Sequence, residues 1–107
     1  MGQKENIRIQ KELKKFKAGV SRDFPVQKMY VFGSRARGTA GKFGDIDLLI
    51  VSPKFRGLDF IRRGARMYDH WEIDHPVDFL CYSPEEFKRM KNRATIVREA
   101  VLHGIEI

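Results

Sequence analysis

The stretch DIDLLIV at residues 45–51 constrains the fold more than any other part of this sequence. After Asp47 it is continuously apolar, and Pro53 stops it soon afterwards. A short apolar run that ends at such a breaker indicates a β-strand buried on both faces. We therefore expect residues 45–51 to form a central strand with other elements packed above and below it.

Two amphipathic helices are expected on either side of this region. Apolar residues at helical spacing predict a first helix over about residues 4–19, ended by Gly19. The segment 57–71 predicts a second helix, although Gly64 weakens it. Its apolar residues at helical spacing are Leu58, Ile61, Ala65 and Tyr68.

The other segments complete an α/β pattern. KMYVFG and PVDFLCY are typical of short strands, and Ser83 before Pro84 predicts a helix that begins at Pro84. A last helix is expected before Gly104, followed by a short extended terminus. The order helix, strand, strand, helix, strand, helix, helix predicts an α/β fold of the α+β type. Its small mixed β-sheet would carry helices mainly on one face.

Length, charge and cysteine content narrow the class of protein. A chain of 107 residues predicts one domain, residues 1–107. The longest apolar run, residues 48–51, is too short to cross a membrane, and no segment resembles a signal peptide. With Cys81 as the only cysteine, a disulfide framework is not supported, and we expect a cytoplasmic protein. The net charge of +7 favours a polyanionic partner.

Carboxylates mark the start of two predicted strands. Asp45 and Asp47 are two residues apart on one strand, so their side chains point to the same face. Their mutual repulsion is unfavourable unless a cation or hydrogen-bond donors offset it. Asp78 lies on the strand of PVDFLCY, and if the two strands are neighbours all three carboxylates converge. Oxygen ligands of this kind suit Mg²⁺ or Mn²⁺, as one ion or a pair.

A glycine-rich basic loop precedes these carboxylates. Gly33 and Ser34 end a strand and open a turn that also carries Arg35 and Arg37. Free backbone N–H groups, a hydroxyl and arginines form an anion site, so we expect this loop to bind phosphate. A triphosphate that bridges the loop and the carboxylate-held metal ions would then be the ligand, which indicates nucleotidyl or phosphoryl transfer.

Gly33-Ser34, ten residues, then Asp45-Ile46-Asp47 resembles the signature of the minimal nucleotidyltransferases in the DNA polymerase beta-like superfamily. The resemblance covers about residues 27–104 and includes Asp78 as the third acidic residue. It implies a nucleotidyltransferase-like fold and Mg²⁺-dependent transfer of NMP from an NTP, with ATP favoured, to an acceptor hydroxyl. It assigns the triphosphate to Gly33 and Ser34, the metal ions to Asp45 and Asp47, and the acceptor's proton to Asp78, which also touches the metal site.

The resemblance also implies a partner. Members of this family are often paired with a helical HEPN protein, and some act as antitoxins that adenylylate a tyrosine on it. One departure is that Gly44 stands where the family often has serine before the first aspartate, which removes one hydroxyl near the phosphates.

Two hypotheses of function stay open at this point. The first is a metal-dependent nucleotidyltransferase; the alternative is a non-catalytic module that binds nucleotide or nucleic acid, or pairs with another protein. The three carboxylates favour the enzyme. The acceptor, the nucleotide base and self-association are left open, and nucleic acid is not favoured. Three arginines of the second helix, Arg62, Arg63 and Arg66, are expected to face solvent.

Overall fold

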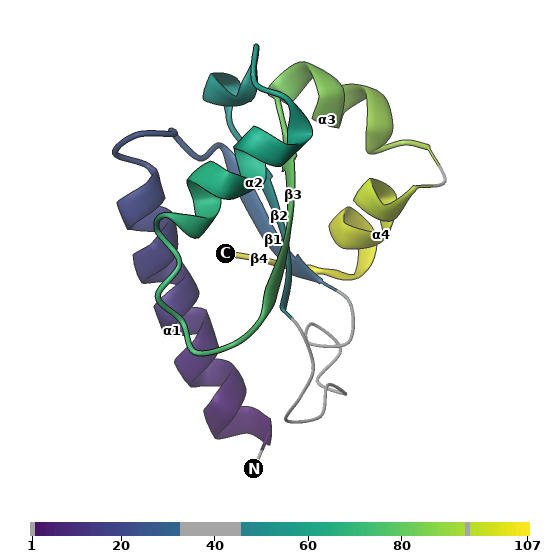
Figure 1. Cartoon of the computed structure of the whole chain (residues 1–107). Helices are drawn as coiled ribbons and strands as arrows, with labels where there is room; N and C mark the ends of the chain where they lie inside the picture. The colour runs from purple at the N-terminus through teal and green to yellow at the C-terminus, as the bar shows by residue number, and fades with distance from the viewer. Residues whose placement is uncertain (1, 33–45, 94) are drawn as a thin grey trace.

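The computed structural model describes residues 2–32, 46–93 and 95–107, with side chains from residue 7 onward (Figure 1). Within these ranges, no helix combines the length and the apolar character that crossing a membrane requires. The order of elements follows the predicted one, with a short 3₁₀ helix and a fourth strand in addition. They are α1 (Gly2–Val20), β1 (Lys28–Phe32), β2 (Ile46–Val51), η1 (Pro53–Phe55), α2 (Phe60–Tyr68), β3 (Val77–Tyr82), α3 (Pro84–Met90), α4 (Ile96–His103) and β4 (Ile105–Glu106).

The four strands form one mixed sheet in the order β3-β2-β1-β4. β2 is parallel to β3 and antiparallel to β1, and β4 pairs antiparallel with the other edge of β1. The backbone N–H of Ile107 donates to the carbonyl of Met29, and Lys17 donates to the carbonyl of Ile107, so the C-terminal residues are held against both β1 and α1. The predicted central position of β2 is confirmed.

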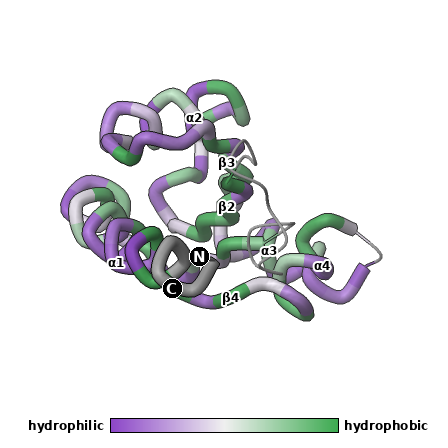
Figure 2. Tube along the Cα trace, turned by 90° about the horizontal axis from the view of Figure 1, so that it is seen from below, coloured by the Kyte–Doolittle hydropathy of each residue, from purple (hydrophilic) through white to green (hydrophobic). Residues whose placement is uncertain are grey.

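The first face of the sheet carries the larger core. Here α1 and Met67 of α2 pack against alternate residues of β1, β2 and β3 (Figure 2). The helix α1 includes Gly19 and ends at Val20, one residue beyond its predicted end. Val20 is completely buried, so the apolar stripe of the helix extends to that position. The buried members of this core from α1 are Ile9, Leu13, Phe16 and Val20.

The second face carries the shorter helices α3 and α4, which lie on the opposite side of the strands from α1 and α2 (Figure 2). Phe87 of α3 and Val97 of α4 pack with Tyr30 and Leu49 of the sheet. The α+β class and the mixed sheet are confirmed. Helices were expected mainly on one face; α1 and α2 cover the first face, and the shorter α3 and α4 pack on the second.

The orientation of α2 differs from the prediction. Ile61 is 83% exposed, although it was expected to pack inward, whereas Tyr68 is 53% exposed but its ring contacts Phe79 of the sheet. The residues that α2 buries are Arg63 and Met67, which are four apart and therefore share another face of the same helix. The apolar spacing identified the helix correctly, but Ile61 lies outside its buried face.

Arg63 was expected to face solvent, but it is buried. Its guanidinium donates to the carbonyls of Leu58 and Cys81 and forms a two-bond pair with Glu86 of α3. Glu86 also closes a capping box with Ser83, which confirms the predicted start of α3 at Pro84. A carboxylate and two carbonyls together compensate the charge, and this explains how an arginine can be buried here.

Candidate active site

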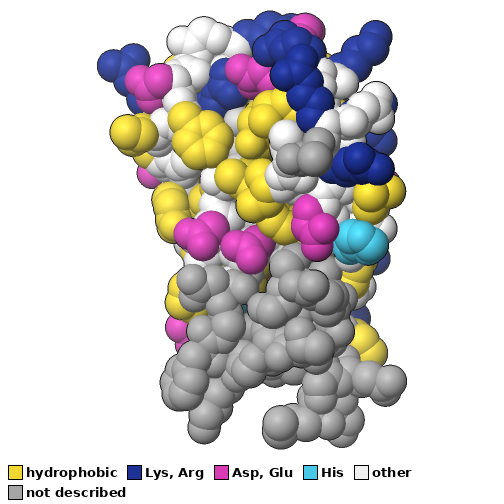
Figure 3. Space-filling model, turned by 90° about the vertical axis from the view of Figure 1, so that its right-hand side faces the viewer, with side chains coloured by type: hydrophobic (Ala, Val, Ile, Leu, Met, Phe, Trp, Pro, Cys, Tyr) yellow, Lys and Arg dark blue, Asp and Glu magenta, His cyan; other side chains and the backbone are white. Residues whose placement is uncertain are grey.

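Two of the predicted carboxylates meet at one end of β2 and β3. In the parallel register Asp47 is the partner of Asp78, and the strands of a sheet lie about 4.8 Å apart. Both side chains therefore point to the second face, where Asp47 is partly buried and Asp78 is exposed. Figure 3 looks onto this side of the molecule and shows acidic side chains in a row across its middle. The predicted convergence of Asp47 and Asp78 required β2 and β3 to be neighbours in the sheet, and they are.

Apolar neighbours hold the two aspartates on this face. Ile46 and Leu48 flank Asp47 and are completely buried in the first-face core. Val77 and Phe79 flank Asp78 and are buried in the same core. Side chains alternate along a strand, so a slip by one residue would expose this apolar set and bury the carboxylates. The packing of the first face therefore fixes the direction of both aspartates.

The beginning of β3 is braced from α2 and from the loop that follows it. The hydroxyl of Tyr68 donates to the carbonyl of Val77 at 2.6 Å, and the indole N–H of Trp71 donates to the carbonyl of His75 at 3.0 Å. Both aromatic rings also contact Phe79 edge-on, with centroids 4.9 and 5.6 Å away. The residues on either side of Asp78 are thus held by hydrogen bonds as well as by packing.

The other predicted site residues lie outside the described residues: Gly33, Ser34, Arg35, Arg37 and Asp45. The sheet nevertheless shows where their segment is attached. β1 ends at Phe32, which is paired with Asp47, and β2 begins at Ile46. Both ends of the segment 33–45 therefore join the sheet beside the aspartates.

The carboxylates of Asp47 and Asp78 are suitable ligands for a hard divalent cation. Asp47 and Asp78 supply carboxylate oxygens from neighbouring positions, which is the ligand type that Mg²⁺ and Mn²⁺ prefer. Within the described ranges no group of three histidine, cysteine or acidic side chains is close enough to hold a metal ion. The third predicted ligand is Asp45, which lies outside those ranges.

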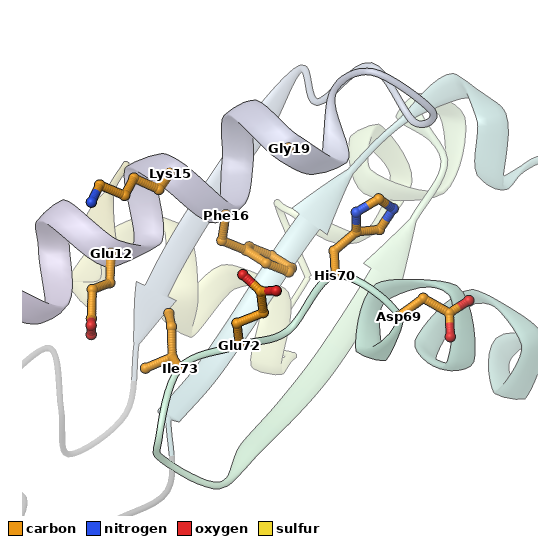
Figure 4. Close-up of a pocket in the computed structure, with 8 residues that line it drawn as sticks. All are labelled: Glu12, Lys15, Phe16, Gly19, Asp69, His70, Glu72 and Ile73. Carbon is orange, nitrogen blue, oxygen red and sulfur yellow. The ribbon is translucent and has the colours of Figure 1, made fainter.

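A separate hollow of about 390 Å³ lies between α1 and the chain that follows α2 (Figure 4). It is lined by residues of α1, among them Phe16 of the first-face core, and by Asp69, His70, Glu72 and Ile73. The Nε2 atom of His70 lies 3.2 Å from a carboxylate oxygen of Asp23. The aspartates point to the other face of the sheet, so we do not include this hollow in the candidate active site.

Comparisons with known proteins agree with this geometry. The family model described as nucleotidyltransferase domain matches residues 13–103. A protein of Haemophilus influenzae named probable protein adenylyltransferase MntA is 34% identical over 77 residues, which cover 68% of this chain and 66% of that protein. This chain therefore spans slightly less than two thirds of that relative. A solved structure from Sulfolobus solfataricus, of a protein assigned as a nucleotidyltransferase, superposes with a TM-score of 0.67 at 28% identity, covering 85% of this chain and 81% of the other.

Proposed function

Because this chain belongs to the nucleotidyltransferase domain family, we propose that it transfers a nucleoside monophosphate from an NTP to an acceptor hydroxyl. The family and enzyme class predicted from the sequence, a minimal nucleotidyltransferase, are confirmed by the comparisons. The observation that carries the proposed mechanism is the pairing of Asp47 with Asp78 on one face, at the end of the sheet where the segment 33–45 is attached.

The proposed reaction is a single displacement at phosphorus. The acceptor oxygen forms a bond to the α-phosphorus of the NTP, the bond from that phosphorus to the β-phosphate oxygen breaks, and pyrophosphate leaves. Asp78 takes the proton of the acceptor hydroxyl, for which its exposed carboxylate is accessible from solvent. Gly33, Ser34, Arg35 and Arg37 hold the triphosphate in this proposal.

Asp45, Asp47 and Asp78 are proposed to hold Mg²⁺, or Mn²⁺ in its place, as one ion or two. When bound, such ions neutralise phosphate charge and lower the pKa of the attacking hydroxyl. Asp47 is better protected from solvent than Asp78, and we assign it to the nucleotide side of the site and Asp78 to the acceptor side.

ATP and a protein acceptor are the favoured substrates in this proposal. The support is the relative's name, probable protein adenylyltransferase, at 34% identity. We propose a tyrosine hydroxyl on a helical HEPN-type partner as the acceptor, with an antitoxin role, because the sequence motif resembles a family in which such pairs occur.

The experiment is transfer of label from α-³²P NTPs to a co-expressed HEPN-type protein, small hydroxylated molecules or an RNA end. Asp78→Asn should lower transfer by at least about 100-fold while NTP affinity is largely kept, since loss of a general base costs about 10²–10⁴-fold. Asp74→Asn is the matched control, because Asp74 is an exposed aspartate in the loop before β3 and should transfer normally. Equal transfer by Asp78→Asn would refute its role. Absence of transfer by the wild-type protein to every acceptor would favour the non-catalytic module.

A further inference from the structure

A shallow cavity of about 390 Å³ opens at the other end of the sheet from the two aspartates. It lies where α2 begins, β3 ends and α3 passes, and we call it the aromatic cavity after Phe60 and Tyr82 in its wall; Arg89 and Met90 also line it. Tyr82 is on the same face of β3 as Asp78, four positions further along the strand, which corresponds to about 13 Å. The cavity is therefore distinct from the candidate active site.

The two aromatic rings of this cavity are only partly covered. Phe60 is 51% exposed, and its ring centroid lies 6.3 Å from that of Tyr82 with the planes tilted by 57°. Phe60 belongs to neither of the two buried cores. An exposed aromatic ring at the mouth of a cavity provides a surface on which a planar apolar group can stack.

The charged residues that line the cavity are Asp59, Arg63, Glu86 and Arg89, and of these only Arg89 has no partner among the described residues. Each acidic side chain at its rim is already paired, Asp59 with Arg62, Glu85 with Arg56 and Glu86 with Arg63. Four exposed cations of α3 and the residues after it have no side-chain partner among the described residues: Lys88, Arg89, Lys91 and Arg93. Figure 3 shows Lys and Arg side chains gathered at the top of this side of the molecule, above apolar side chains.

From this combination we infer that the aromatic cavity, with Arg89 in its wall and the other exposed cations of α3 and the residues after it, forms a binding site for single-stranded nucleic acid. A base stacks on Phe60 beside Tyr82, and the sugar-phosphate backbone runs along Arg89 and the neighbouring cations. The site goes beyond the proposed transfer reaction, because it requires neither the aspartates nor the segment 33–45.

Nucleic acid fits these features better than an acidic protein surface does. Exposed cations attract any polyanion, but an acidic protein has no need of the exposed ring of Phe60. Base stacking uses the ring and the charges together and is tolerant of sequence, so we expect binding without a strong base preference.

The experiment measures fluorescence anisotropy of labelled 12-nucleotide oligo(dT) and oligo(U) with the full chain over a range of salt concentrations. Phe60→Ala should weaken binding by about 5- to 150-fold, the range for loss of one stacked base. Ile61→Ala is its matched control, because Ile61 is the adjacent and more exposed apolar residue of α2 and does not line the cavity. The control should bind like the wild-type protein.

The charge contribution is tested with equal changes of charge at two places. Arg89→Gln with Arg93→Gln should weaken binding and lower the slope of log K against log salt by about 1.4, whereas Lys11→Gln with Lys14→Gln on α1 should leave both nearly unchanged. A 12-residue poly-Glu peptide should compete poorly. The inference is overturned if Phe60→Ala binds like the wild-type protein, if both double variants weaken binding equally, or if poly-Glu competes as well as the oligonucleotide.

Discussion

Arg63 connects α2, β3 and α3, and its removal should be the most damaging single substitution outside the apolar cores. Its side chain is 9% exposed, and it makes four hydrogen bonds, two of them to Glu86 at 2.6 and 3.2 Å. Arg63→Met keeps an apolar stem but removes the guanidinium that lies over Phe55 and the hydrogen bonds that it donates to Leu58, Cys81 and Glu86. Breaking such a buried pair costs about 3–5 kcal/mol of unfolding free energy.

The contribution of charge can be separated from that of the helix cap. Glu86→Gln keeps a residue that can complete the capping box with Ser83, so it removes mainly the negative charge that faces Arg63. Equilibrium unfolding in urea of the wild-type protein, both single variants and the double variant then gives a coupling free energy. We expect about 1–3 kcal/mol, with the double variant less destabilised than the sum of the two single ones.

The same coupling should depend on pH in a defined direction. The hydrogen bonds from Arg63 lower the pKa of Glu86 below its ordinary value of 4.5. A carboxyl group whose pKa is lowered in the folded state stabilises the protein at pH values above its ordinary pKa. This stabilisation is lost as the pH falls through the lowered pKa. The coupling should therefore be complete at neutral pH and should decrease as the pH falls below 4.5. Free energies that add within about 0.5 kcal/mol at neutral pH would refute this account of Arg63.

Three further predictions concern other parts of the molecule. Tyr68→Phe removes the hydrogen bond to Val77 but keeps the ring, so it should cost about 1 kcal/mol in urea unfolding. If that bond positions Asp78, the substitution should also lower kcat for transfer with little change in KM for the NTP. An unchanged kcat would mean that Tyr68 contributes to stability and not to the position of Asp78. Gly104→Ala places a methyl group against the carbonyl of Ala100 and 2.9 Å from that of Val31, so a loss of about 1–3 kcal/mol is expected, and wild-type stability would contradict it. Burial raises the pKa of the Cys81 thiol to about 12, so a thiol reagent should modify it at neutral pH only as fast as the protein unfolds; rapid labelling of the native state would disprove this.

The elements that local sequence signals specify were predicted well. Ser83, Pro84 and Glu86 are close in sequence and determine the start of α3 by themselves, and the apolar run of β2 predicted its central position.

The buried face of α2 could not be predicted in this way. Ile61 and Tyr68 fit helical spacing as well as Arg63 and Met67 do, and the residue that makes Arg63 suitable for burial is Glu86, which lies 23 positions later. Likewise the sequence placed Asp47 beside Asp78 only on the condition that their strands pair. That condition depends on contacts between segments some thirty residues apart, which local spacing does not contain.

The edge strand β3 explains how the fold can carry charged and exposed residues at functional positions without losing stability. Its residues alternate, with Val77, Phe79 and Cys81 buried on the first face and Asp78, Leu80 and Tyr82 exposed or partly exposed on the second. The first-face residues, the parallel pairing with β2 and the bond from Tyr68 hold the strand in place. On the second face Leu80 and Tyr82 still pack against the smaller core, but Asp78 is exposed, so a polar group at that position lowers stability little. The aspartates at one end of this face and the aromatic cavity at the other both depend on this division, so substitutions on the first face should disturb both, whereas substitutions on the second face should disturb one at a time.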